Sequence, residues 1–136
     1  MKENLSVLYV EDDPLSRKLM RMLLVGRMQI PHVTIFENSE NFLEKVQTLQ
    51  PKPDIIFLDI HMTPIDGFAM LKILKQLEWA KHSRIVALTA SVMNEEVMML
   101  RQEGFSGCLA KPIDLATFPG IFQQILDGES VWRIIS

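Results

Sequence analysis

Short, almost continuous apolar runs alternate with longer segments of mixed polarity along the chain. The apolar runs lie at Leu5–Val10, Val33–Phe36, Asp54–Leu58, Arg84–Thr89 and Gly107–Ala110. Such runs are typical of strands covered on both faces, as in a parallel sheet, although periodicity alone does not distinguish them from buried helical turns. Their short length and the breaking residues that flank them favour strands.

The segments between these runs have apolar residues at helical spacing. Five predicted helices follow Pro14, Ser39, Gly67, Ser91 and Asp114. The first, second, fourth and fifth are expected to end near Gly26, Pro51, Gly104 and Gly128, and the third carries apolar residues as far as Leu77. Ser39 and Ser91 are expected to be N-caps, because a hydroxyl oxygen can accept a bond from a free backbone N–H, and the fourth helix is expected over Val92–Glu103. Pro119 lies inside the last segment, so we expect a kink there or a new helix that begins at Pro119.

This alternation predicts an α/β fold with a doubly wound, five-stranded parallel sheet and helices on both faces. The chain has 136 residues, which suits one domain, and we assign residues 1–127 to it. Residues 128–136 form a tail with apolar side chains at Val131, Trp132, Ile134 and Ile135. This tail could pack back on the domain, form a dimer seam or begin a linker.

Composition narrows the classes of function. Hydrophobic residues make up 48% of the chain and charged residues 23%, which is typical of a globular protein. The net charge of −3 indicates no basic surface for direct nucleic-acid binding. The histidines and the lone Cys108 lack zinc-ligand spacing, and one cysteine suits a reducing compartment. Leu5–Val10 is too short for a signal-peptide core or a membrane span, so we expect a cytoplasmic protein with no membrane partner.

Polar residues that could bind ligands or take part in a reaction follow the predicted strands. They are Glu11, Asp12 and Asp13 after the first strand, Asp59 after the third, Thr89 at the end of the fourth and Lys111 after the fifth. Ligands of such sheets bind beyond the carboxyl ends of the strands, so these side chains should converge. Two carboxylates ~5 Å apart repel by roughly 3 kcal/mol at an effective dielectric constant near 20, so this cluster calls for a cation, and oxygen ligands favour Mg²⁺.

The same residues suit phosphoryl transfer. Lys111 offers a positive charge and Thr89 a hydrogen bond to a phosphoryl group, while Asp59 is a credible nucleophile. The sequence has neither the GxxxxGK loop nor the GxGxxG turn of nucleotide sites, so the phosphoryl group should come from another kind of donor.

At this point the sequence resembles the receiver domain of response regulators in two-component signalling, the CheY-like family. The matching segments are Val7–Pro14, Asp54–Asp59 with the following Met62 and Asp66-Gly67, Ala87–Ala90 and Ala110–Pro112. Each segment is a weak signal by itself, whereas all of them in order and at the family's intervals are a strong one. The resemblance implies the flavodoxin-like strand order 2-1-3-4-5.

The resemblance also implies a function. Asp59 would accept a phosphoryl group from a phosphohistidine of a histidine kinase or a histidine phosphotransfer protein, and Thr89 and Lys111 would contact the phosphoryl oxygens. The implied Mg²⁺ ligands are Asp12, Asp59, the backbone carbonyl of His61 and, mostly through water, Glu11. Phosphorylation would switch the face formed by the fourth helix, the fifth strand and the fifth helix, which is also a candidate homodimer surface. The chain would act on no external metabolite and would not be an enzyme in that sense.

Two positions depart from the family's pattern. Thr63 stands where the family usually has proline, with Pro64 next to it. Cys108 stands where the family often has a tyrosine or phenylalanine that rotates inward as the hydroxyl residue, here Thr89, moves. Our hypothesis is that phosphorylation moves the region around the fourth helix and fifth strand without an aromatic gate. Cys108 itself is expected to be buried, and the His61 side chain is expected to face solvent.

Two other functions remain open at this stage. The chain could be a receiver-shaped interaction module that no longer switches, which the departures at Thr63 and Cys108 would favour. It could also be a small phosphatase with an aspartate nucleophile, but such enzymes usually have an Asp-x-Asp run after the first strand, where this chain has Glu11-Asp12-Asp13.

Overall fold

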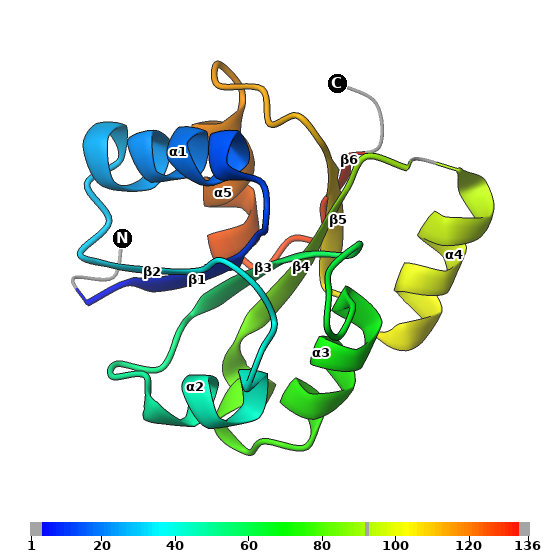
Figure 1. Ribbon diagram of the computed structural model, residues 1–136. Helices are drawn as coiled ribbons and strands as arrows, with labels where there is room; N and C mark the ends of the chain where they lie inside the picture. Colours follow the sequence, from blue (N-terminus) through cyan, green and yellow to red (C-terminus); the bar gives the residue numbers. More distant parts are fainter. Residues whose placement is uncertain (1–3, 92, 134–136) are drawn as a thin grey trace.

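The structure is a computed structural model that describes residues 4–91 and 93–133. Within these residues one sheet contains six parallel strands in the order β2-β1-β3-β4-β5-β6 (Figure 1). The strands are β1 (Ser6–Val10), β2 (His32–Phe36), β3 (Ile55–Asp59), β4 (Arg84–Thr89), β5 (Gly107–Ala110) and β6 (Trp132–Arg133). The predicted order 2-1-3-4-5 is confirmed, and the short β6 is an addition at the edge beside β5.

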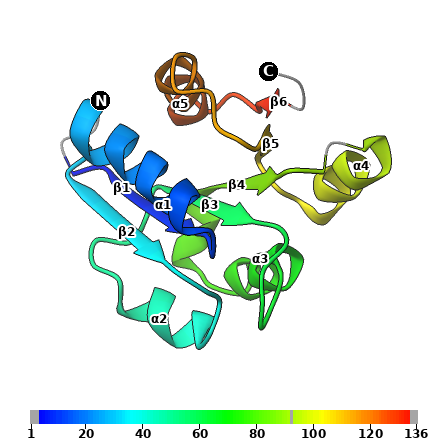
Figure 2. The ribbon, with the colours of Figure 1, turned by 45° about the horizontal axis from the view of Figure 1, so that its top comes forward.

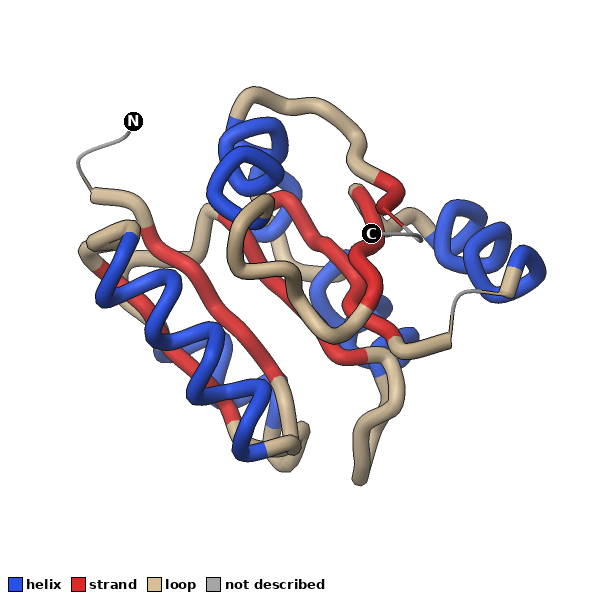
Figure 3. Tube along the Cα trace, turned by 90° about the horizontal axis from the view of Figure 1, so that it is seen from above, coloured by secondary structure: helices blue, strands red, loops and turns tan. Residues whose placement is uncertain are grey.

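Helices cover both faces of the sheet, as predicted (Figures 2 and 3). The α-helices are α1 (Pro14–Arg21), α2 (Phe42–Thr48), α3 (Gly67–Lys75), α4 (Asn94–Glu103) and α5 (Phe118–Leu126). One apolar core packs α1 and α5 against the sheet, and the other packs α2, α3 and α4 against the opposite face. β1 and β3 are buried at every residue because they lie in the middle of the sheet under both layers.

Two predicted helix caps are wrong. The Ser39 hydroxyl donates to the Ile65 carbonyl oxygen at 2.7 Å and accepts from the Ile65 N–H at 2.9 Å, so it joins two loops instead of capping a helix. Helix α2 begins later, after Asn41. Ser91 is not a cap either, since α4 follows Met93, which makes no side-chain capping bond. The predicted start at Val92 lies outside the described residues.

The first and last helices also differ from expectation. The predicted first helix is continuous to Gly26, but α1 ends at Arg21 and the chain continues through a π-helical segment, η1 (Met22–Arg27). Helix α5 begins at Phe118 with Pro119 in its first turn, so the alternative of a new helix holds and the kink does not. A short 3₁₀ segment, η2 (Trp79–His82), precedes β4.

The described part of the tail packs back on the domain. In β6, Trp132 pairs in register with Cys108 of β5, whose backbone N–H donates to the Val131 carbonyl oxygen at 2.8 Å. The Arg101 guanidinium of α4 lies 4.5 Å from the centre of the Trp132 ring. The tail therefore contacts both β5 and α4, whereas Ile134 and Ile135 lie outside the described residues. Among the described helices, none has the length and apolar character of a membrane span.

Candidate functional site

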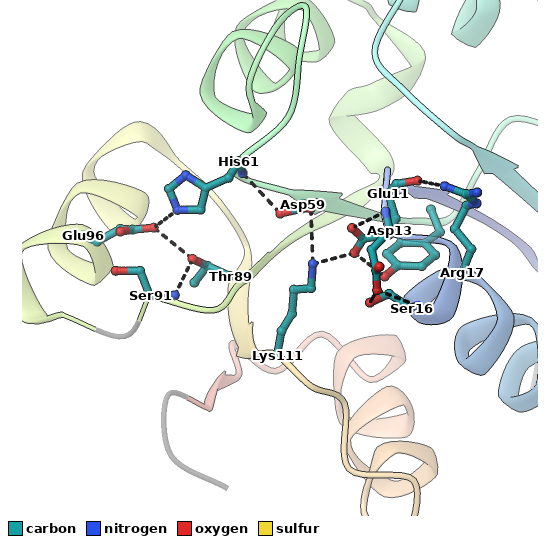
Figure 4. Close-up of polar contacts among 11 residues, drawn as sticks. Glu11, Asp13, Ser16, Arg17, Asp59, His61, Thr89, Ser91, Glu96 and Lys111 are labelled. Carbon is teal, nitrogen blue, oxygen red and sulfur yellow. Dashed lines mark hydrogen bonds and ion pairs between the residues drawn. The ribbon is translucent and has the colours of Figure 1, made fainter.

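The carboxyl edge of the sheet brings together Glu11, Asp59 and Lys111, as predicted from the sequence (Figure 4). Strands β1 and β3 are direct neighbours, so Glu11 and Asp59 leave the sheet side by side. The Lys111 Nζ lies 2.8 Å from Glu11 Oε1 and 3.3 Å from Asp59 Oδ2. One ammonium group thus bridges two carboxylates from distant parts of the chain.

Glu11 is fully buried and held on several sides. The Tyr9 hydroxyl donates to Glu11 Oε1 at 2.7 Å, and the Asp13 backbone N–H donates to Oε2 at 3.2 Å. Burial acts to raise the pKa of Glu11, but hydrogen bonds, among them those from Lys111 and Tyr9, outweigh it and lower the pKa. Glu11 is therefore charged in the folded protein. In the same network, burial and the Glu11 carboxylate raise the pKa of Tyr9 far above its usual range.

Asp59 is also buried, with only 4% of its surface exposed. Its Oδ1 accepts a hydrogen bond from the His61 backbone N–H at 3.2 Å. Burial, together with the neighbouring Glu11 carboxylate, raises the pKa of Asp59 to about 7. Burial lowers the pKa of Lys111, but the two carboxylates more than compensate and raise it. One cation thus faces two buried acids, and a second cation would favour the charged form of Asp59.

The acidic residues can accommodate a metal ion. Glu11, Asp12 and Asp59 each offer a carboxylate oxygen, and these oxygens lie within 4.8 Å of one another. Asp12 is exposed while the other two are buried, so the cluster opens toward solvent on one side. A hard, all-oxygen set with an open side suits Mg²⁺, which keeps several waters in most protein sites. The donor set therefore fits the predicted ion.

Asp13, the third acid of the run after β1, caps helix α1. Its Oδ2 accepts hydrogen bonds from the Ser16 backbone N–H at 2.9 Å and from the Ser16 hydroxyl at 2.6 Å. These two bonds lower the pKa of Asp13. Within the run after β1, the first two carboxylates thus join the acidic cluster and the third starts the helix.

Thr89 lies at the end of β4, and its hydroxyl faces α4 (Figure 4). It donates to Glu96 Oε1 at 3.0 Å and accepts from the Ser91 backbone N–H at 3.0 Å. The same Glu96 oxygen lies 3.5 Å from His61 Nε2, whose side chain is 64% exposed, as expected for a solvent-facing ring. Glu96 is a polar partner that our sequence reasoning missed, because two adjacent glutamates in a first helical turn are common for helix-dipole reasons alone.

Tyr9 was also missed, although the sequence holds a signal for it. A tyrosine inside a fully buried strand needs a partner for its hydroxyl, and the nearest polar residue on the same face of the strand is Glu11, two positions later. Cys108 is buried, as predicted, and burial together with the nearby Glu96 carboxylate raises its pKa to about 11. Its thiol is thus protonated and unreactive at neutral pH.

Known proteins with similar sequences identify the family of this chain. The pattern of the response regulator receiver domain matches residues 7–122. The polar-differentiation response regulator DivK of Brucella anthropi is 32% identical over 114 residues, which cover 83% of this chain and 89% of DivK. The signal transduction histidine-protein kinase BarA of Shigella flexneri is 31% identical over 127 residues, which are 93% of this chain but only 13% of BarA.

Solved structures agree on the fold. The chemotaxis response regulator CheY4 of Vibrio cholerae superimposes with a TM-score of 0.78 at 24% identity, over 89% of this chain and 98% of CheY4. The family match runs from within β1 through β5 and includes the acidic cluster. The chain belongs to the response regulator receiver domain family of two-component signalling.

Proposed function

We propose that this chain accepts a phosphoryl group on Asp59 from a phosphohistidine of a histidine kinase or a histidine phosphotransfer protein. The observation that carries this proposal is the Lys111 ammonium group, which lies within 3.3 Å of both buried carboxylates at the edge where ligands of such sheets bind. A buried acid beside a fixed cation and an acidic cluster suits a nucleophile that takes up an anionic group.

The reaction would transfer phosphorus between two protein side chains. An Asp59 carboxylate oxygen attacks the phosphorus atom, the phosphorus–nitrogen bond of the donor breaks, and the histidine nitrogen keeps the electron pair. Lys111 would then pair with a phosphoryl oxygen, and the Thr89 hydroxyl would donate a hydrogen bond to another. Hydrolysis of the acyl phosphate would return Asp59, so the chemistry is confined to the protein's own side chain and needs no external metabolite.

Mg²⁺ would be held by the carboxylates of Glu11, Asp12 and Asp59 and by the backbone carbonyl of His61. A bound ion supplies charge neutralisation for the phosphoryl oxygens. Since burial and Glu11 raise the pKa of Asp59 to about 7, the cation also favours the ionised, nucleophilic form of that side chain.

A phosphorylation assay tests this proposal directly. The protein is incubated with acetyl phosphate in the presence and absence of Mg²⁺, quenched in acid and measured by intact mass spectrometry. We expect the mass of one added phosphoryl group in Mg²⁺, loss of that group in base, and no adduct in Asp59→Asn. An unmodified wild-type protein would contradict the proposal and favour an interaction module, while steady phosphate release from unrelated monoesters would favour a phosphatase.

A further inference from the structure

The Thr89 hydroxyl forms its hydrogen bonds with partners other than Asp59. It donates to Glu96 Oε1 at 3.0 Å, and it accepts the Ser91 backbone N–H at 3.0 Å. Asp59 takes its own hydrogen bonds from the His61 N–H and from Lys111. Figure 4 draws no contact between Thr89 and Asp59, and the Thr89 hydroxyl lies on the side of α4.

A threonine hydroxyl has a single proton to donate. Thr89 can therefore donate to the Glu96 carboxylate or to a phosphoryl oxygen on Asp59, but not to both. A bond to a charged acceptor is stronger than one between neutral groups, and the Thr89 side chain is fully buried, so this choice has an energetic cost. Glu96 thus competes directly with a phosphoryl group for the same proton.

Glu96 is itself well placed to hold this bond. Only 19% of its side chain is exposed, and its Oε1 also lies 3.5 Å from His61 Nε2. It belongs to the first turn of α4, which begins after Met93 without a side-chain cap. Glu96 therefore ties an uncapped helix start to the end of β4 and to the loop after β3.

We propose that Glu96 is a positioning residue that holds the Thr89 hydroxyl toward α4 in the unmodified protein. Phosphorylation of Asp59 then redirects the Thr89 hydroxyl, which keeps its proton but donates its hydrogen bond to a phosphoryl oxygen instead of to Glu96, and this releases the first turn of α4. This inference rests on the proposed function of Asp59 and adds a residue to it. It also offers a route to α4 that needs no aromatic side chain at the position of Cys108.

The test measures affinity for beryllium fluoride in Mg²⁺, a mimic of the phosphoryl group, by titration of ¹H–¹⁵N spectra. Removing the competing acceptor in Glu96→Ala should tighten binding about tenfold. Glu95→Ala is the matched control, because Glu95 lies in the same first turn and its replacement removes the same charge. It should change affinity less than about twofold. Glu96→Gln keeps an acceptor oxygen and should gain less than Glu96→Ala.

A double-mutant cycle identifies the route of the effect. In a Thr89→Val background, where no hydroxyl exists, Glu96→Ala should leave affinity unchanged. An equal gain with or without the hydroxyl would attribute the effect to general charge and overturn the inference. Gains in Glu96→Gln and Glu95→Ala as large as the gain in Glu96→Ala would do the same. Amide spectra of each variant check that it is folded.

The free protein provides a readout that does not depend on the mimic. Without beryllium fluoride, Glu96→Ala should shift the Thr89 and Ser91 amide signals, whereas Glu95→Ala should not. If the wild-type protein binds no mimic, the proposed function fails, and this inference fails with it. If the wild-type protein binds the mimic but Glu96→Ala binds equally well, only the role of Glu96 is refuted.

Discussion

Asp59 and Glu11 are two neighbouring buried acids, and their burial has consequences for stability. In the protein without Mg²⁺, burial and the Glu11 carboxylate raise the pKa of Asp59 to about 7 from its ordinary value of 3.8. A carboxyl group whose folded-state pKa is raised binds more protons in the folded than in the unfolded state between those two values. Its contribution to stability is therefore fully present below about pH 4 and is lost as the pH rises to about 7.

From this we predict that Asp59→Asn stabilises the ion-free protein at pH 8. The amide cannot ionise, so the variant avoids the cost of a buried charge, and we expect a gain of about 1–3 kcal/mol in the free energy of unfolding. The gain should shrink as the pH falls toward 5. Urea denaturation in EDTA at several pH values measures it.

The control for this prediction is Asp12→Asn, which removes a carboxylate from the same cluster at an exposed position. We expect a much smaller change in the free energy of unfolding there, since an exposed carboxylate stays hydrated when the protein folds. A wild-type protein that is more stable than Asp59→Asn at pH 8 would show that Lys111 fully compensates the burial of Asp59.

A further residue-scale prediction concerns Tyr9, whose hydroxyl donates to Glu11 Oε1 at 2.7 Å inside the core. Tyr9→Phe keeps the ring and its packing but leaves a buried carboxylate with one fewer donor. We expect a loss of about 1–3 kcal/mol in the free energy of unfolding. Equilibrium denaturation at pH 8 measures it, and an unchanged midpoint would mean that Lys111 and the Asp13 N–H suffice to hold Glu11.

At the scale of elements, β6 depends on the absence of a side chain in β5. A Cβ atom placed on Gly107 would lie 2.5 Å from the Val131 carbonyl oxygen, which is a backbone atom that cannot move aside cheaply. We predict that Gly107→Ala separates β6 from β5, breaks the bond from the Cys108 N–H to Val131, and lowers the free energy of unfolding by about 1–3 kcal/mol.

Hydrogen exchange of the Cys108 amide and fluorescence of Trp132 measure this separation, because both groups report on the β5–β6 pair. Gly120→Ala is the matched control, since a Cβ there meets nothing within 4 Å. It should be neutral or slightly stabilising, as alanine is favoured over glycine inside a helix. Equal protection of the Cys108 amide in wild type and Gly107→Ala would contradict the prediction.

Sequence patterns predicted the elements well where a local rule decides the structure. The short apolar runs at β1, β3, β4 and β5, flanked by breaking residues, favoured buried strands between two layers. Gly104, with a positive φ of 104°, ends α4 as expected. The Ser39 cap failed because a distant partner, the backbone of Ile65, takes both of its hydrogen bonds. A tertiary contact of this kind leaves no local trace in the sequence.

In the candidate site, too, the sequence predicted residues that follow a local rule but missed a contact that depends on the tertiary structure. Glu11, Asp59 and Lys111 were predictable, because each directly follows or ends a strand and parallel strands share one carboxyl edge. The Glu96 contact was not, since it depends on where α4 begins and how that helix turns its first residues toward Thr89. Strand β6 was missed for a similar reason: two residues are too short a run to show any periodicity.

At the scale of the whole molecule, the described tail changes the predicted dimer surface. Strand β6 occupies the edge of β5, and Trp132 stacks on Arg101 of α4. A homodimer through α4, β5 and α5 would therefore have to use side chains on the helices and could not extend the sheet at β5 while β6 stays in place. The exposed side chains of Met98 and Met99 on α4 offer such a helical surface.

The ion, the acids and the fold are linked through one equilibrium, so Mg²⁺ should stabilise the whole molecule. A ligand that binds only the folded state adds RT ln(1 + [L]/Kd), or about 1.4 kcal/mol at ten times the Kd. At pH 6 Asp59 must first lose a proton to bind the ion, because its pKa is about 7. The Mg²⁺-induced rise in the unfolding midpoint should therefore be larger at pH 8 than at pH 6.

Asp12→Asn and Asp59→Asn should abolish most of the Mg²⁺-induced rise, whereas Glu129→Gln, which removes an equal charge at an exposed position, should keep it. Thermal unfolding at constant ionic strength distinguishes site binding from screening, and an equal rise in all variants would mean that the acidic cluster holds no specific ion.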